Sequence, residues 1–283
     1  MATCFRILGR GSDQRQIRQA ALAAFAEIDH LERMFSRFRE GSDVHRANEA
    51  PPGAWIRVGR DTLDCLEIAL RVSAASGGRF DPGLGSWTGD PFLVEADISA
   101  SIAPPAPVPA LELNLETRCV RRASHAVRID LGAIGKGYAL DRAATILADW
   151  EIPAVLLDAG GSTLLARNVA GALPHWSARL GDDDASPELT VSDMAVAGSG
   201  LGTQGAHIVD GRARSSSTRP GRVWACAPTA ALADAWSTAF FLMPWNEVES
   251  VCVENPELGA AATPEHGHNR LHTCGAMLSL LVP

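Results

Sequence analysis

The 283-residue sequence has no stretch of eighteen consecutive apolar residues, and its first residues contain no basic segment followed by an apolar one. Those two patterns mark membrane-spanning helices and export signals. The six cysteines stand far apart, so their spacing gives no sign of a disulfide framework. These absences predict a cytoplasmic protein with reduced thiols and no membrane span. A chain from which an export leader had been removed would show the same pattern.

Clustered positive charge is also missing. Lys and Arg number 25 against 33 Asp and Glu, for a net charge of −8, and the basic residues between 212 and 222 are interrupted by Ser, Thr and Pro. A protein that follows a nucleic-acid backbone needs a basic surface, so we expect no nucleic-acid partner. An anionic ligand would need a metal ion or backbone amides to hold it.

The composition is that of an ordinary globular protein, with 46% hydrophobic and 20% charged residues. Strand-like and helix-like stretches alternate without an internal repeat. We therefore expect one α+β domain over residues 1–283, compact and two-lobed, with mixed β-sheets and flanking helices. A Pro- and Ala-rich stretch at about 88–112 predicts an irregular excursion.

Hydrophobic periodicity predicts the main elements. Asp61 is a candidate N-cap for one helix, which Gly77 and Gly78 would end. A glycine turn is expected between two strands, and the last long helix should begin after Pro228 and Thr229. The expected elements are a strand at 3–8, helices at 13–36 and 61–76, strands within 113–130, a strand, turn and helix over 127–150, a strand, turn and strand over 154–168, and a helix over 230–243.

The segment "ADAWSTAF", residues 233–240, carries oxygen ligands in an apolar, helix-like run. At 3.6 residues per turn, Asp234 and Thr238 project from one face, with Ser237 beside them. One carboxylate, hydroxyls and a backbone carbonyl form a set that suits Mg²⁺. A solvent-facing Asp234 on a half-buried helix would explain the same pattern.

The segment "GAIGKG", residues 132–137, resembles a phosphate loop but fits neither the Walker nor the dinucleotide pattern. In one interpretation, Lys136 and free backbone amides at a helix start meet an anion, and Asp130 accepts hydrogen bonds from a bound ring. In the other, the glycines only serve a tight strand-to-helix turn.

Two other candidate sites are weaker. His266, His268, His272 and Cys274 are zinc-ligand types, but their spacing fits no common zinc pattern and equally suits a polar hairpin turn. The segment "GSGLG" places Ser199 one position away from the order of a serine-hydrolase elbow.

Several motifs in order resemble the family of FAD:protein FMN transferases, and the resemblance covers nearly the whole chain. The motifs are "MATCFRI", "MFSRFREGSDVHRAN", "SGGRFDPGLG", "IDLGAIGKGYALDRAA", "LLDAGGS", "HIVDG" and "ADAWSTA". The resemblance implies a magnesium-dependent reaction that passes FMN from the substrate FAD to a threonine hydroxyl of an acceptor protein and releases AMP.

The resemblance also implies which residues form the site. The magnesium ligands would be the backbone carbonyl of Ala133 with Asp234, Thr238 and, as a possible contributor, Ser237. The flavin contacts would be Met1, Phe38, Arg79, Phe80, Asp81, Asp130, Lys136 and the backbone around Ile208. His207 and Asp81 are candidates for the general base by residue type alone.

Two alternative functions remain open. Water in place of the threonine would make the protein an FAD pyrophosphate hydrolase that yields FMN and AMP. A flavin-binding protein without turnover is the other alternative, because the segment between "AVAGSG" and "AHIVDG" is short for the family and "GRARSSS" replaces its usual continuation.

Overall fold

The computed structural model describes residues 3–85, 110–168, 175–179, 188–200, 208–213, 215–217, 221–263 and 271–281. Its largest element is a seven-stranded sheet in which every neighbouring pair of strands is antiparallel. In spatial order its strands are β1 (Phe5–Arg10), β5 (Ala154–Ala159), β6 (Thr163–Asn168), β9 (Ala195–Gly200), β12 (Arg222–Ala227), β13 (Gly259–Ala262) and β14 (His272–Gly275).

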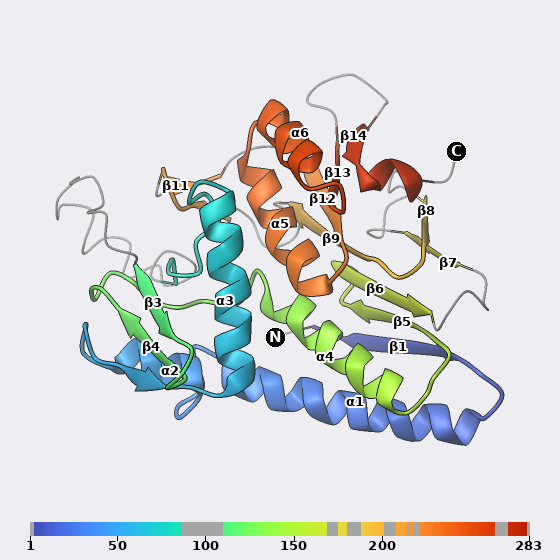
Figure 1. The fold of residues 1–283 in the computed structure, drawn as a ribbon, viewed down its shortest axis with the longest axis horizontal. Coiled ribbons are helices and arrows are strands. Elements are labelled where there is room, and N and C mark those ends of the chain that lie inside the picture. Colours follow the sequence, from blue (N-terminus) through green and yellow to red (C-terminus); the bar gives the residue numbers. More distant parts are fainter. Residues whose placement is uncertain are drawn as a thin grey trace.

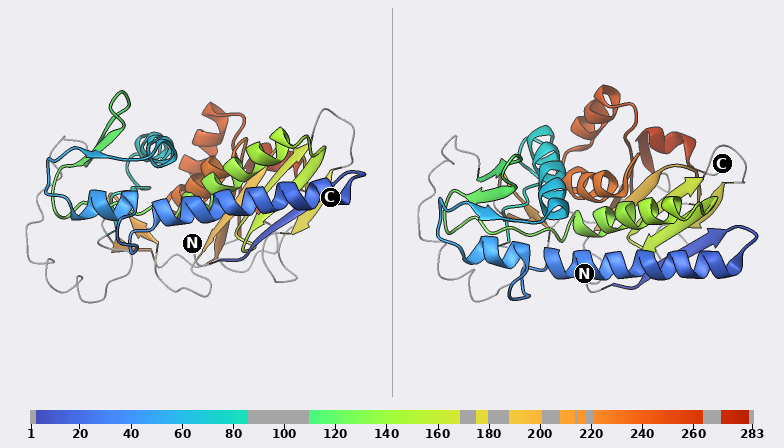
Figure 2. Two further views of the ribbon diagram at one scale, coloured as in Figure 1. Left: turned by 90° about the horizontal axis from the view of Figure 1, so that it is seen from below. Right: turned by 60° about the horizontal axis from the view of Figure 1, so that its bottom comes forward.

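Three helices cover one face of this sheet, as Figures 1 and 2 show: α1 (Gln14–Phe35), α4 (Gly135–Asp149) and α5 (Ala230–Leu242). Buried residues of α1 recur at helical spacing, and α5 is apolar on most of its surface, which is why both pack into the main core. The helix α6 (Trp245–Glu254) follows α5 directly.

The opposite face of the sheet has a smaller hydrophobic core. Alternate residues of β5 divide between the two faces, with Val155 and Leu157 in the main core and Leu156 in the smaller one. The ribbon of β7 (Trp176–Arg179) and β8 (Glu188–Val191) and the 3₁₀ helix η1 (Ala276–Ser279) contribute residues to this second core. The central strands of the sheet are therefore buried on both faces, whereas its edge strands β1 and β14 are partly exposed.

A second lobe lies at the C-terminal end of α1 (Figure 1). It contains α2 (Asp43–Glu49) and a three-stranded antiparallel sheet of β2 (Ile56–Arg57), β4 (Cys119–Arg122) and β3 (Leu111–Asn114). The helix α3 (Arg60–Ala75) stands between this sheet and α5. A short ribbon of β10 (Val209–Asp210) and β11 (Ser215–Ser216) completes the described elements. The expected α+β class is confirmed.

Three local expectations need correction. Gly59, not Asp61, is the N-cap of α3, and Asp61 instead accepts a hydrogen bond from the Tyr138 hydroxyl. Residues 127–130 form one isolated bridge, between Arg128 and Leu84, rather than a strand. The excursion expected at about 88–112 ends earlier, because Leu111 begins β3, and its residues 88–109 lie outside the described part.

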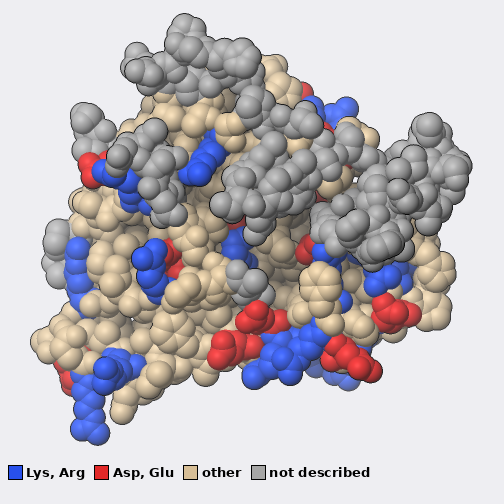
Figure 3. Space-filling model, turned by 180° about the vertical axis from the view of Figure 1, so that it is seen from behind, with Lys and Arg blue, Asp and Glu red and all other residues tan. Residues whose placement is uncertain are grey.

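None of the helices in the described ranges is both long and apolar enough to cross a membrane. On the face seen in Figure 3, acidic and basic side chains lie intermixed, and along its lower edge groups of opposite charge alternate.

Candidate functional site

The carboxylate of Asp234 is buried in the middle of α5, with only 4% of the residue exposed. Its Oδ2 accepts a hydrogen bond from the backbone N–H of Gly137 at 3.1 Å, and its Oδ1 accepts one from the Thr163 hydroxyl at 3.2 Å. The Lys136 ammonium lies 3.5 Å from Oδ1. Asp234 is thus a buried charge surrounded by donors, and the solvent-facing alternative is wrong.

Three further hydroxyl groups form a hydrogen-bonded cluster between α5 and β9. Ser199, at the end of β9, places its Oγ 2.8 Å from Ser237 Oγ and 3.2 Å from Thr238 Oγ1. Ser237 also donates to the backbone carbonyl of Asp234 at 2.8 Å. One residue of β9 and two residues of α5 therefore bring three hydroxyl oxygens together, and the two on α5 lie within about one helical turn of Asp234 along the chain.

The start of α4 supplies the opposite side of this group. Lys136 donates to the carbonyl of Gly132 at 3.3 Å, across the turn that contains Ala133. Asp130, just before the turn, accepts the N–H of Gly132 at 2.8 Å and so fixes the turn's entry. The turn that carries the Ala133 carbonyl leads directly into α4, whose first turn provides Lys136 for the ion pair to Asp234.

The donor set suits a hard cation. It offers one carboxylate and several hydroxyls, the ligand types that Mg²⁺ accepts while it keeps some of its waters. Among the described residues, no three His, Cys, Asp or Glu side chains gather at a metal-binding distance, so this set does not resemble a zinc or a calcium cage. The residues present fit Mg²⁺.

A second group of predicted residues lies at the turn after α3. Arg79 donates to the carbonyl of Leu242, the last residue of α5, at 3.2 Å and pairs with Asp210 and Glu247. Its Nε is buried and has no hydrogen-bond partner in the described part of the chain. Arg79 therefore joins the end of α5 to the β10–β11 ribbon.

The neighbours of Arg79 divide between the core and the turn. Phe80 is buried in the main core, and Asp81 accepts the N–H of Gly83 at 2.7 Å. Ile208 is buried at the start of the ribbon, where its carbonyl accepts the N–H of Ser217.

Phe38 stands apart from these residues, with 80% of its surface exposed. The Arg37 guanidinium lies over its ring, 4.6 Å from the ring centroid, and also 3.5 Å from the Asp130 carboxylate. Arg37 donates to the carbonyl of Gly85 at 2.6 Å as well. An exposed ring, a cation and an acid thus lie together at the entry to the turn before α4.

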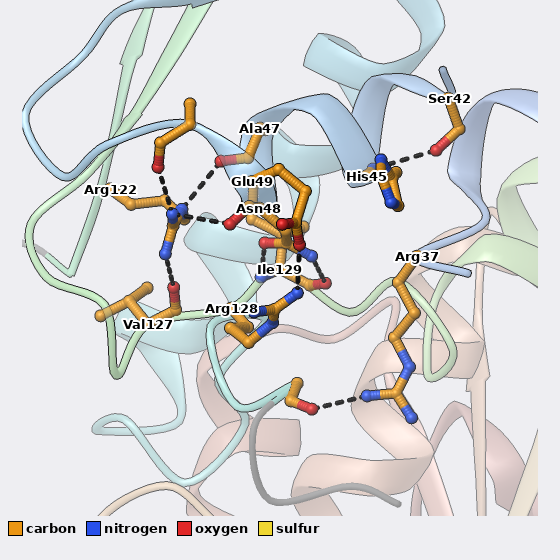
Figure 4. Close-up of polar contacts among 12 residues, drawn as sticks. Arg37, Ser42, His45, Ala47, Asn48, Glu49, Arg122, Val127, Arg128 and Ile129 are labelled. Atoms are coloured by element: carbon orange, nitrogen blue, oxygen red, sulfur yellow. Dashed lines mark hydrogen bonds and ion pairs between the residues drawn. The ribbon is translucent and has the colours of Figure 1, made fainter. Parts of the chain in front are cut away.

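Buried polar contacts fix the chain that leads to this turn (Figure 4). The Asn48 side chain donates to the carbonyl of Ile129 and accepts its N–H, in the manner of a strand partner. Arg128 pairs with Glu49. The second lobe therefore holds Asp130 in place through the two residues before it.

Several candidates from the sequence lie outside the described residues, namely Met1, His207, His266 and His268. The other two zinc-type residues are described, and each has a different neighbour: the His272 ring lies 5.6 Å from the Trp245 ring, and Cys274 hydrogen-bonds with Cys252.

Three residues beside the site, Thr163, Asp141 and Ser199, are not predicted as part of it from the sequence, where Ser199 is a candidate only as a nucleophile. Thr163 follows the glycine turn between β5 and β6, and Ser199 ends β9, so both strand ends meet α5 only in the folded chain. Asp141 lies in the motif "GYALDRAA" and accepts the backbone N–H groups of Ala230 and Ala231, both at 2.8 Å. The one available signal was that Ser199 and Asp141 stand inside or next to the quoted motifs.

Comparison with known proteins gives a consistent result. The model of the ApbE family matches residues 1–262. The chain is 23% identical to an FAD:protein FMN transferase of Klebsiella pneumoniae, over 90% of this chain and 79% of that protein. It is 26% identical to one of Treponema pallidum, over 87% of this chain and 77% of that protein.

Solved structures show the same fold. The ApbE protein of Thermotoga maritima has a TM-score of 0.75 at 22% identity, covering 98% of both chains. The flavin transferase ApbE of Vibrio cholerae has a TM-score of 0.76 at 18% identity, covering 99% of this chain and 96% of that one. With a family model matched over most of its length, the chain belongs to the ApbE family.

Proposed function

We propose that the protein is a magnesium-dependent FAD:protein FMN transferase that esterifies FMN to a threonine hydroxyl of an acceptor protein and releases AMP. Relatives of that name align over most of their own length with this chain. The observation that carries the proposal is the buried Asp234 carboxylate, which accepts a hydrogen bond from the Thr163 hydroxyl and lies 3.5 Å from the Lys136 ammonium in the first turn of α4.

Asp234, Thr238 and the Ala133 carbonyl would hold Mg²⁺, with Ser237 beside them. When bound, the ion would neutralise charge on the FAD pyrophosphate. Ser199 and Thr163 orient these ligands, because each donates to or accepts from a ligand side chain.

The remaining predicted residues bind and orient FAD. Lys136, at the first turn of α4, is a cation beside the proposed metal ligands and suits a phosphate. The exposed Phe38 ring offers a stacking surface, and Asp130 offers an acceptor close to it. Met1, Arg79, Phe80, Asp81 and Ile208 remain proposed flavin contacts.

In the proposed reaction, the threonine oxygen forms a bond to the FMN-side phosphorus while the bond from that phosphorus to the AMP oxygen breaks. The threonine proton must pass to a base, and Asp81 and His207 are the proposed candidates.

We further propose that residues 1–283 act as one domain, since the proposed site draws on both lobes and the ribbon between them. The six cysteines carry free thiols, which supports the proposed cytoplasmic location.

The test incubates the purified protein with FAD, Mg²⁺ and a threonine-containing acceptor domain from a flavinylated redox protein. We expect AMP release that requires both Mg²⁺ and acceptor, together with the mass of FMN on the acceptor. The Asp234→Asn variant should lose activity by roughly a hundredfold or more, because a metal ligand is removed. Asp149→Asn, an exposed acid at the end of α4, is the matched control.

Two results would contradict the transfer proposal. AMP release that is independent of the acceptor would identify a hydrolase, and tightly bound FAD without AMP release would identify a binding protein. Full activity of Asp234→Asn would contradict the metal assignment.

A further inference from the structure

The proposed metal ligands come from two separate helices. Ala133 precedes α4, whereas Asp234, Ser237 and Thr238 lie on α5. The distance between the two ligand groups therefore depends on how α4 and α5 are held together. Mg²⁺ demands near-ideal ligand geometry, so a small shift between these helices would weaken its binding.

The two helices touch most closely at Gly137. A Cβ added there would lie 2.1 Å from the carbonyl oxygen of Ala230, so only glycine fits at this crossing. The Gly137 N–H donates to Asp234, and Lys136 pairs with the same carboxylate. Both of these contacts use atoms of a proposed metal ligand.

Asp141 links the same helices without using a ligand atom. It lies four residues after Gly137 on α4, and its two carboxylate oxygens each accept one N–H from the first two residues of α5, Ala230 and Ala231. Ala230 in turn lies four residues before Asp234. The contacts of Gly137 and Asp141 are therefore spaced by one helical turn on both helices, which fixes rotation as well as separation.

The opposite end of α5 is held by a charge of opposite sign. Arg79 donates to the carbonyl of Leu242, the last residue of the helix. An acid at the N-terminus and a base at the C-terminus both match the helix dipole. Because Asp141 and Arg79 come from other elements, they locate α5 relative to α4 and to the turn after α3.

We propose that Asp141 is a positioning residue that sets the geometry of the metal site by holding the first turn of α5 against α4. This inference rests on the proposed function, because it takes Asp234 and Thr238 as metal ligands. Asp141 does not contact the ion. It would keep the two ligand groups at the separation that Mg²⁺ requires.

The test measures Mg²⁺ binding directly, by calorimetric titration of Mg²⁺ into the FAD-loaded full-length protein without acceptor. Asp141→Asn places an amide NH₂ where one oxygen now accepts an N–H, so it removes at least one of the two contacts. We expect the Kd for Mg²⁺ to rise about tenfold, the size typical of lost support behind a metal ligand. FAD affinity should change less than twofold, and Asp149→Asn should match the unchanged protein.

A second measurement separates positioning from loss of folded protein. If Asp141 positions the ligands, turnover of Asp141→Asn should need about tenfold more Mg²⁺ for half-saturation and return near the normal kcat at saturating Mg²⁺. A partly unfolded variant would show a lower kcat with unchanged half-saturation. Asp141→Ser, whose shorter side chain removes both contacts without placing an NH₂ against an N–H, serves the same test if the asparagine variant does not fold, and should raise the Mg²⁺ requirement in the same way.

The outcomes are distinguishable. An unchanged Mg²⁺ Kd in both Asp141 variants, beside normal binding by the parent protein, would overturn this inference and leave the proposed function intact. A lower kcat with unchanged half-saturation would also overturn it. If the parent protein binds no Mg²⁺ in the presence of FAD, the proposed function itself fails.

Discussion

Asp141 combines two opposing effects in one side chain. Burial raises its pKa to about 6, while the N–H groups of Ala231 and Ala230 and the charge of Arg167 act in the opposite direction. The negative charge of Asp234 adds to the increase. The ionised carboxylate is therefore less favourable here than in water, although it accepts two hydrogen bonds. A residue kept at such a cost is more readily explained by the placement of α5 than by stability.

This raised pKa makes folding stability depend on pH. The unfolded carboxyl releases its proton near its usual value of 3.8, and the folded one at about 6. Between these values the folded state binds more protons, so the free energy of unfolding falls as the pH rises through this window. A difference of this size corresponds to about 3 kcal/mol. The stabilisation of the folded state that comes from the raised pKa of Asp141 is fully present below about pH 4 and lost above about pH 7.

This pH dependence is tested by urea unfolding of the parent protein and of Asp141→Asn at several pH values from 4 to 7.5. We expect the stability of the parent protein, relative to Asp141→Asn, to fall by about 3 kcal/mol across this range. Asp141 lines a cavity of about 560 Å³, so water and protons have access to its surroundings. A constant difference between the two proteins would show that Asp141 titrates near its usual pKa.

At the scale of elements, α4 and α5 can cross closely because Gly137 has no side chain. Gly137→Ala would place a Cβ 2.1 Å from the Ala230 carbonyl oxygen, a backbone atom that moves only if the helix moves. We expect the free energy of unfolding to fall by about 3 kcal/mol, as for other overpacked cores. Mg²⁺ binding should weaken in parallel, because the same shift separates Ala133 from Asp234.

Gly135→Ala is the matched control, two residues earlier in the same helix. Its Cβ would lie 3.3 Å from Cδ2 of the Phe35 ring, and a side chain can adjust more easily than a backbone carbonyl. We expect a loss of less than about 1 kcal/mol, measured by the same urea unfolding. Equal losses in both variants would mean that the α4–α5 crossing tolerates a methyl group.

The sequence predicts some elements better than others. Some elements are determined by neighbouring residues, whereas others depend on contacts with distant parts of the chain. The start of α5 was predicted correctly, because Thr229 caps it and an apolar run follows within the same segment. The helix α2 was not predicted. It has only seven residues in a polar segment, and Asn48, near its end, bonds to Ile129, 81 residues away. Asp61 has the type of an N-cap, but its partners Tyr138 and Arg142 come from α4.

The same distinction applies to the site. Asp234 and Thr238 can be paired from helical spacing alone, because four residues along one helix face the same way. Ser199 and Asp141 cannot, since their partners lie 38 to 90 residues away in the sequence. Those contacts depend on the order of strands in the sheet and on one helix crossing, neither of which a local pattern contains.

At the scale of the whole molecule, one buried arginine holds the second lobe together and anchors the chain that leads from it toward Asp130. Arg122, at the end of β4, is 4% exposed, and its guanidinium points toward carbonyl oxygens on both sides, including those of Ala47 and Val127 (Figure 4). The other acceptors are the carbonyls of Asn48, Ala50 and Ser124. Burial lowers the pKa of Arg122 from its usual value. The end of α2 and the chain leading to Asp130 are thus attached to one side chain.

Arg122→Met tests whether the second lobe, which this side chain stabilises, unfolds together with the rest of the chain. The substitution leaves buried carbonyl oxygens without a donor, so we expect a loss of about 4 kcal/mol in the free energy of unfolding. Arg121→Met, one residue earlier, is the matched control, because Arg121 is about one-third exposed and pairs with Glu112. We expect this variant to lose about 1 kcal/mol or less in the free energy of unfolding. Circular dichroism and tryptophan fluorescence should follow one shared transition, because the seven tryptophans include Trp55 beside β2 of the smaller lobe and Trp236 in α5 of the larger one. Separate transitions in the parent protein would contradict a single domain over residues 1–283, and an unchanged midpoint in Arg122→Met would show that the hydrogen bonds of Arg122 are not needed for the stability of the second lobe.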